Sequence, residues 1–199
     1  GLLGDGDDLW VGTFEHGIDI MDVRTGKVKK HFIAGSREYD LKSNFGLCFN
    51  RTSSGKFLIG TSNGLFYYNR NKNEFKRAEQ LTNNVFISAL QEDHNKIIWI
   101  GTHDHGVYWF NLIDKDHGHI ENAQQGTHSL ANLTINDIYE DSKNHIWIAT
   151  EGAGLCKLSS DRKKNTGSGP QIRRLSYYPQ RRNDTGRCHS FKRRGERGL

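Results

Sequence analysis

The chain alternates short apolar runs with polar turns, and the alternation repeats four times. The runs at 9–13, 57–61, 98–102 and 146–150 share one order: an apolar residue, a large apolar anchor, an apolar residue, a small residue and a threonine. Their anchors are Trp10, Leu58, Trp99 and Trp147, which lie 48, 41 and 48 residues apart. Three or four residues after each threonine comes a glycine followed by an apolar residue. Runs of β-branched and aromatic residues bounded by turn signals predict β-strands.

A period of roughly 40–50 residues is typical of β-propeller blades, each of which is a four-stranded antiparallel sheet. In the third unit we expect strands at 85–92, 97–102, 106–111 and 118–122. Blades stack face to face, so their inner strands should be apolar on both sides. The strand count predicts an all-β fold, a β-propeller fragment of about three and a half four-stranded blades from a larger ring, for example a seven-bladed one.

An acidic pair precedes each of the last two anchors. The pairs are Glu92-Asp93 and Glu140-Asp141, and each Asp lies six residues before its Trp. The pair recurs unit by unit at a predicted turn, so we interpret the Asp residues as acceptors of hydrogen bonds from that turn rather than as catalytic groups. The glycine that ends an apolar run should mark a place where another backbone comes close.

These features resemble the two-component regulator propeller repeat. The match is carried by residues 138–150, Ile-Tyr-Glu-Asp-Ser-Lys-Asn-His-Ile-Trp-Ile-Ala-Thr, followed by Gly154-Leu155. The resemblance covers residues 9 to about 160. The second unit departs most, because Leu58 replaces Trp and Arg51-Thr52 stands in place of the acidic pair.

The resemblance implies the periplasmic sensor region of a hybrid two-component histidine kinase of the Bacteroidetes. Such proteins commonly detect polysaccharide breakdown products and control the matching utilisation genes. By resemblance we expect an oligosaccharide ligand, contacts with neighbouring blades of a longer parent chain, and a homodimeric parent in the inner membrane. The histidine kinase would lie in the parent, and the chain itself is not expected to be an enzyme.

The net charge of +5 divides unevenly along the chain. Residues 1–160 carry 16 Lys/Arg and 20 Asp/Glu, whereas residues 161–199 carry 12 and 3. We therefore divide the chain into propeller blades (1–160) and a basic, irregular tail (161–199). The tail could bind nucleic acid or an anionic surface, could be a solvated end, or could be non-native sequence from a reading-frame error. The repeat stops in mid-blade, which favours the third interpretation, so no nucleic-acid partner is predicted.

The sequence contains no Gly-x-Ser-x-Gly, no phosphate-binding loop and no His-Glu-x-x-His. The histidine clusters at 103–105 and 116–119 are interpreted as exposed turn residues and not as metal ligands. Cys48 and Cys156 are interpreted as ordinary strand residues. We predict no catalytic residue, metal or cofactor. Two alternatives to a sensor stay open: a fragment of a propeller glycoside hydrolase or lyase, and a non-catalytic interaction scaffold.

The equivalence of the blades predicts where a ligand would bind. The turns between the second and third strands all lie on one side of a propeller, and the linkers between blades emerge on that side too. Polar side chains mixed with aromatic ones suit a sugar, because hydroxyl groups need hydrogen-bond partners and ring faces stack. The candidate ligand-binding residues are Glu15, His16, Tyr39, Asn63, His103, Asp104, His105 and Glu151. Further linker positions on this side are Glu38, Asn83, Asn84, His128 and Asn132.

Overall fold

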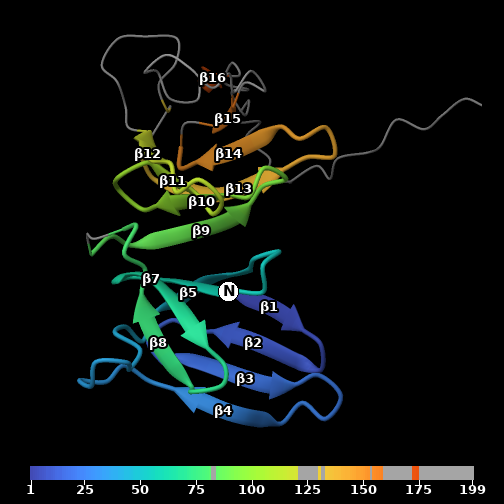
Figure 1. Ribbon diagram of the computed structural model, residues 1–199, viewed down its shortest axis with the longest axis vertical. Helices are drawn as coiled ribbons and strands as arrows, with labels where there is room; N and C mark the ends of the chain where they lie inside the picture. Colours follow the sequence, from blue (N-terminus) through green and yellow to red (C-terminus); the bar gives the residue numbers. More distant parts are fainter. Residues whose placement is uncertain (82–83, 121–129, 131–132, 153, 159–171, 175–199) are drawn as a thin grey trace, which may run out of the picture.

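A computed structural model describes residues 1–81, 84–120, 130, 133–152, 154–158 and 172–174. In this part of the chain all regular structure is β, arranged as four antiparallel four-stranded sheets that follow one another in chain order (Figure 1). The all-β propeller fragment is therefore confirmed. Among the described residues, no helix is long and apolar enough to span a membrane.

Every sheet is a simple meander in which each strand pairs with the next one along the chain. The first sheet contains β1 (Leu2–Asp5), β2 (Asp8–Gly12), β3 (Ile18–Asp22) and β4 (Val28–Phe32), and the second contains β5 (Gly46–Arg51), β6 (Phe57–Thr61), β7 (Gly64–Asn69) and β8 (Glu74–Arg77). The third contains β9 (Ile87–Glu92), β10 (Ile97–Thr102), β11 (Val107–Asn111) and β12 (His117–Ile120), and the fourth contains β13 (Ile135–Glu140), β14 (Ile146–Thr150), β15 (Gly154–Leu158) and β16 (Ile172–Arg174).

The structure contains four complete four-stranded sheets, whereas about three and a half blades were predicted. Strand β1 was missed because no Glu-Asp pair lies six residues before Trp10, and the turn joining β1 to β2 holds only Gly6 and Asp7. Strand β16 was missed because it lies in the basic segment after the last recognisable motif. Apart from β16, the predicted tail after residue 160 lies outside the described residues.

Three hydrophobic cores lie between successive sheets. The core between the first two sheets is built around Trp10 and Phe66, that between the second and third around Leu58 and Ile98, and that between the third and fourth around Trp99 and Ile148. The inner sheets are thus covered on both faces, and every residue of β6 is buried. This confirms the predicted two-sided burial of the inner strands.

The small residue of each repeat lets the next sheet pack closely. A Cβ atom on Gly12 would lie 2.1 Å from the carbonyl oxygen of Gly46, and one on Gly101 would lie 2.6 Å from Ile135 Cγ2. Real Cβ atoms do not approach other heavy atoms this closely. The predicted approach of another backbone is confirmed at Gly12, whereas at Gly60 and Gly101 the nearest atoms of the next sheet belong to the side chains of Ile87 and Ile135.

The threonine of each repeat closes the turn between the second and third strands of its sheet. Its hydroxyl group donates a hydrogen bond to the carbonyl oxygen of a second glycine, three or four residues further along the chain, and that glycine has a positive φ. The four pairs are Thr13–Gly17, Thr61–Gly64, Thr102–Gly106 and Thr150–Gly154, at 2.8–2.9 Å. Because glycine adopts positive φ at little steric cost, this spacing specifies the turn locally.

The Asp of the acidic pair closes the turn between the first two strands. Asp93 Oδ1 accepts hydrogen bonds from the backbone N–H groups of Asn95 and Ile97, and its Oδ2 accepts one from Trp99 Nε1 at 2.8 Å. Asp141 repeats the arrangement with Trp147 Nε1, also at 2.8 Å. The predicted turn role of both Asp residues is confirmed.

The Glu of the pair has a second role, which the sequence analysis did not identify: it links its sheet to the preceding one. Glu92 accepts hydrogen bonds from the backbone N–H of Ser53 at 2.5 Å and from its hydroxyl at 2.6 Å. Glu140 accepts one from the backbone N–H of His94 at 3.0 Å and also contacts the His94 ring. Each Glu thus reaches the first turn of the sheet before its own.

Between the first two sheets the polarity of this link is reversed. Arg51 occupies the position of the Glu, and its partner is Asp5 of the first sheet. Arg70 contacts the same carboxylate. Trp10 Nε1 is buried with no hydrogen-bond partner, whereas the equivalent Trp99 donates to its Asp. Asp5 therefore serves the contact between sheets rather than the indole of its own sheet.

Candidate functional site

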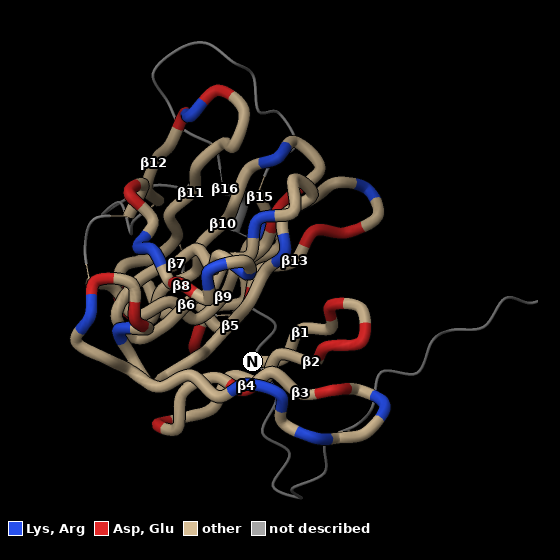
Figure 2. The backbone as a smooth tube through the Cα atoms, turned by 60° about the horizontal axis from the view of Figure 1, so that its bottom comes forward, with Lys and Arg blue, Asp and Glu red and all other residues tan. Residues whose placement is uncertain are grey.

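The two ends of the stacked sheets differ in what they present. One end, here called the upper rim, carries the turns between second and third strands together with the linkers between sheets. The other end, the lower rim, carries the remaining turns, and charged residues concentrate in the turns (Figure 2). Backbone hydrogen bonds join the turns of the upper rim to the linkers, as from His103 N to Phe86 O at 3.0 Å and from Glu151 N to Thr134 O at 2.9 Å. The predicted ligand-binding residues of the turns belong to this end, but Tyr39 does not: its carbonyl oxygen accepts a hydrogen bond from Phe75 N at 2.8 Å, at the start of β8 and next to the lower rim.

In the first sheet the upper rim presents an exposed aromatic edge. Phe14 is 68% exposed, and its ring packs edge-on against Phe45 at a centroid distance of 4.8 Å. Beside it, Glu15 has a φ of 75°, which turns the chain sharply, and His16 Nδ1 lies 3.2 Å from the carbonyl oxygen of Phe14. An acidic and an imidazole side chain therefore flank an exposed ring.

The third sheet has a second aromatic contact on this rim. The ring of His103 lies 5.2 Å from that of Phe86. The next two residues, Asp104 and His105, interact through Asp104 Oδ1 and His105 Nδ1 at 2.5 Å, and both side chains are exposed. Phe45 and Phe86 were not predicted to contact the rings of Phe14 and His103. A sequence feature that could have identified both is that each immediately precedes the first strand of its sheet.

The other predicted residues have different surroundings. Asn63 Nδ2 donates to the carbonyl oxygen of Lys42 at 3.2 Å, so this side chain holds the linker. Tyr39 is 44% exposed, and a hydrogen bond with Glu38 raises the pKa of its hydroxyl. Glu151 is exposed in its turn. The structure brings predicted residues into direct contact within one turn, as Asp104 and His105 show.

Some linker positions cannot be placed on this rim. Asn83, His128 and Asn132 lie outside the described residues, whereas Asn84 is described and exposed.

The chemistry of the rim favours non-covalent binding. Within the described ranges, no group of three or more His, Cys, Asp or Glu side chains is arranged to hold a metal ion. Burial raises the pKa of the Cys48 thiol to about 12, so this thiol is protonated and a poor nucleophile at neutral pH. What the rim offers is exposed rings beside hydrogen-bonding groups, an arrangement suited to sugars.

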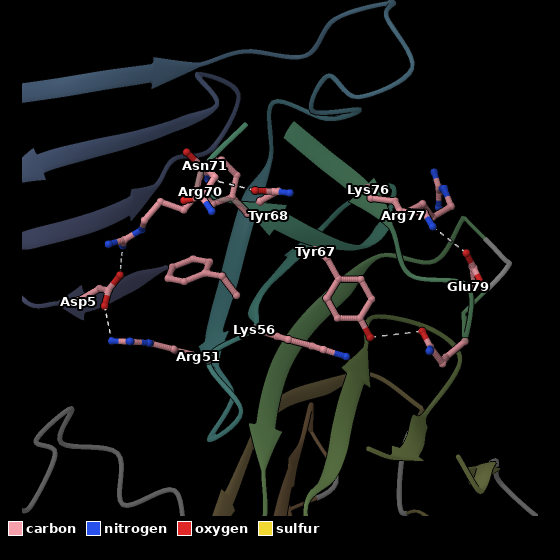
Figure 3. A pocket seen from close by; sticks show the side chains of 14 residues that line it. Asp5, Arg51, Lys56, Tyr67, Tyr68, Arg70, Asn71, Lys76, Arg77 and Glu79 are labelled. Atoms are coloured by element: carbon pink, nitrogen blue, oxygen red, sulfur yellow. Dashed lines mark hydrogen bonds and ion pairs between the residues drawn. The ribbon is translucent and has the colours of Figure 1, made fainter. Parts of the chain in front are cut away.

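A second concave region was not found from the sequence. A cavity of about 650 Å³, here called the blade-2 groove, lies along the second sheet and opens at the lower rim (Figure 3). Its lining contains five cationic side chains: Arg51, Lys56, Arg70, Lys76 and Arg77. Charge counted per sheet could have identified it, because residues 46–80 carry six Lys/Arg and two Asp/Glu within an otherwise acidic run of sheets.

Two segments of the chain match a known family of repeats. A family profile described as "Two component regulator propeller" matches residues 80–104 and 129–152. These two segments therefore match two-component regulator propeller repeats. Both matched segments contain the second strand of their sheet and an acidic pair before it, Glu92-Asp93 in the first and Glu140-Asp141 in the second.

Two similar proteins belong to signalling systems. The extracellular domain of the hybrid two-component system BT3049 from B. thetaiotaomicron is 27% identical, with a TM-score of 0.62, over 76% of this chain and 18% of that one. Histidine kinase P4 of Formosa agariphila is 32% identical over 154 residues, which is 65% of this chain and 11% of the kinase. The chain thus spans a small part of both relatives.

The fold alone is shared more widely. The WD40 β-propeller domain of Doa1 superimposes with a TM-score of 0.58 at 13% identity, over 78% of this chain and 48% of that one. Taken with the repeats, the similarity to the BT3049 extracellular domain and to the histidine kinase relates this propeller segment to the sensor regions of two-component systems.

Proposed function

We propose that this chain is part of the periplasmic sensor of an inner-membrane hybrid histidine kinase, and that its upper rim binds an oligosaccharide. The kinase would then control genes for the use of the matching polysaccharide. In this proposal the parent is a homodimer, and the propeller passes ligand binding to the kinase through neighbouring blades. The similarity to a two-component ectodomain and to a histidine kinase supports the signalling part.

One observation carries the ligand class: two aromatic contacts on the upper rim lie beside polar turns. The Phe14 edge is flanked by Glu15 and His16, and the His103 ring is followed by Asp104 and His105. Carboxylate and imidazole groups form hydrogen bonds with paired hydroxyl groups, while exposed rings pack against the apolar face of a pyranose.

The test is calorimetric titration of the chain with a panel of neutral and acidic oligosaccharides. The His103→Ala, His105→Ala double variant should bind its best oligosaccharide about tenfold more weakly, because two hydrogen-bonding rings are lost. His117→Ala is the matched control, since this exposed histidine lies on the same sheet at the start of β12, away from the upper rim. Unchanged affinity of the double variant, with unchanged folding by circular dichroism, would remove these residues from the site.

The division of the chain near residue 160 stays part of the proposal. We propose that the basic residues after it, other than those of β16 (Ile172–Arg174), are not propeller sequence and arise from a change of reading frame. Sequencing the coding DNA tests this: an alternative frame should restore an acidic pair followed by Trp-Ile-Gly-Thr. An open reading frame with no such motif in any frame would contradict it.

A further inference from the structure

The blade-2 groove combines a fixed pair of arginines with an aromatic ring and two lysines. Figure 3 shows Asp5, Arg51 and Arg70 at one end of the groove, on the side of the second sheet toward the first, and Lys56 and Tyr67 at the other, where Tyr67 packs against the core between the second and third sheets. The lining residues carry five cationic side chains and two anionic ones, Asp5 and Glu79. The groove is therefore cationic, although the sheets as a whole carry more acidic than basic residues.

The arginine end is organised by a buried carboxylate. The side chain of Asp5 is 6% exposed, whereas those of Arg51 and Arg70 are 56% and 54% exposed. Arg51 Nη1 contacts one carboxylate oxygen and Arg70 Nη2 the other. A guanidinium group has five N–H donors, so most donors of both arginines stay available. Arg70 Nη2 also lies 3.9 Å from Asp8 Oδ2, so the two arginines face two carboxylates, and the excess positive charge of the groove comes from its lysines and Arg77.

The other end places cations around a ring. Lys56 Nζ lies 5.6 Å from the centre of the Tyr67 ring, and the Tyr67 hydroxyl lies 3.4 Å from Gln80 Oε1. Lys76 is paired with Glu79 at 2.9 Å, and both side chains are mostly exposed. The exposed pair is weak, so Lys76 can exchange its partner at small cost. Tyr67 thus offers a partly exposed ring with ammonium groups close by.

We propose that the blade-2 groove binds an acidic oligosaccharide, one whose sugar rings carry carboxylate or sulfate groups. The paired guanidinium groups match the planar, two-oxygen face of such anions, and Tyr67 supports a sugar ring. The upper rim carries Glu15, Asp104 and Glu151, which would repel the same groups. This inference rests on the proposed function, because it assumes that the sensed ligand is a saccharide, and it assigns the anionic part to a separate site.

The test uses the full chain and three probes of equal length: a sulfated dextran oligosaccharide, an oligogalacturonate and an uncharged dextran oligosaccharide. At 0.15 M salt at least one anionic probe should bind, and the uncharged one should bind at least tenfold more weakly. The stronger of the two anionic probes tells whether sulfate or carboxylate is preferred. Binding should weaken further as salt is raised, because partly exposed charges are screened.

Variants separate the groove from general positive charge. The Lys56→Ala, Arg70→Ala double variant should lose at least tenfold in affinity for the anionic probe, while Arg51 still pairs with Asp5 and preserves the link between sheets. Lys72→Ala is the matched control, because Lys72 is exposed in the same turn as Arg70 and does not line the groove. It should bind like the unchanged chain.

Three results would overturn the inference: the uncharged probe binds as well as the anionic ones, Lys72→Ala weakens binding as much as the double variant, or the double variant binds normally. If an oligosaccharide binds and only the His103→Ala, His105→Ala variant weakens it, the proposed function survives and the groove inference fails. If no oligosaccharide of any charge binds, both fail.

Discussion

The third and fourth sheets carry the same motif at different depths of burial. In both, the Trp indole donates to an Asp six residues earlier at 2.8 Å. Trp99 is fully buried because the fourth sheet packs over it, whereas Trp147 is only partly buried. On the same face of the fourth sheet Tyr139 is 62% exposed, and a hollow runs past Ala149 and Leu155.

This difference shows that two kinds of interaction build one blade. The hydrogen bonds of the motif form wherever the motif occurs, because all their partners lie within a few residues. The burial of the Trp depends on a neighbouring sheet that covers it. Among the described residues, such a cover exists for the third sheet and not for the exposed face of the fourth.

The largest expected difference is between Trp99→Ala and Trp147→Ala. The first should lower the free energy of unfolding by about 3–5 kcal/mol, because it empties a buried volume between two sheets. The second should cost about 1–2 kcal/mol, because the side chain is already partly in water. Urea unfolding at pH 7 measures both values. Equal losses would show that the fourth sheet is covered as completely as the third.

A pH dependence specific to the fourth sheet should come next. The hydrogen bond from Trp147, followed by those from His145, holds the pKa of the Asp141 carboxyl far below its usual range. The ionised form is therefore favoured by folding. Its contribution is complete above the ordinary pKa of about 3.9 and is lost as the pH falls towards the folded value.

Replacing this carboxylate should remove the dependence. The Asp141→Asn variant should be less stable than the unchanged chain at pH 6, and the gap should narrow as the pH falls from about 4 to 2. Urea midpoints measured across this range provide the comparison, with Asp114→Asn as a control in an exposed turn of the third sheet. A constant gap across the range would disprove the role given to Asp141.

The smallest effect concerns the turn that follows each Asp. Lys96 and Asn144 occupy equivalent positions with φ values of 65° and 63°. Asn tolerates this left-handed conformation better than Lys does. Lys96→Gly should therefore raise the free energy of unfolding by about 0.5 kcal/mol, and Asn144→Gly should change it less. Thermal unfolding of both variants decides this, and a loss of stability in Lys96→Gly would contradict it.

Much of the upper rim could be predicted from the sequence, because equivalent turns of a repeat lie on one side. The turns of His16, His103 and Glu151 were placed there without a structure. Their aromatic partners were not, since Phe45 and Phe86 adjoin inner strands and reach the rim only through the packing. The blade-2 groove was missed as well, because its residues lie on five strands of two sheets and on the turns between them.

The sequence by itself determined the blade: the Thr–Gly and Asp–Trp hydrogen bonds span three to six residues, so the repeat specifies them wherever it occurs. Only the tertiary structure decided how the blades meet. Glu92 accepts a hydrogen bond from Ser53, which lies 39 residues away in the sequence, and Asp5 accepts one from Arg70, which lies 65 residues away. Contacts of this length depend on how one sheet lies on the next, and that is set by the close approach at the repeat glycines and by the cores between the sheets.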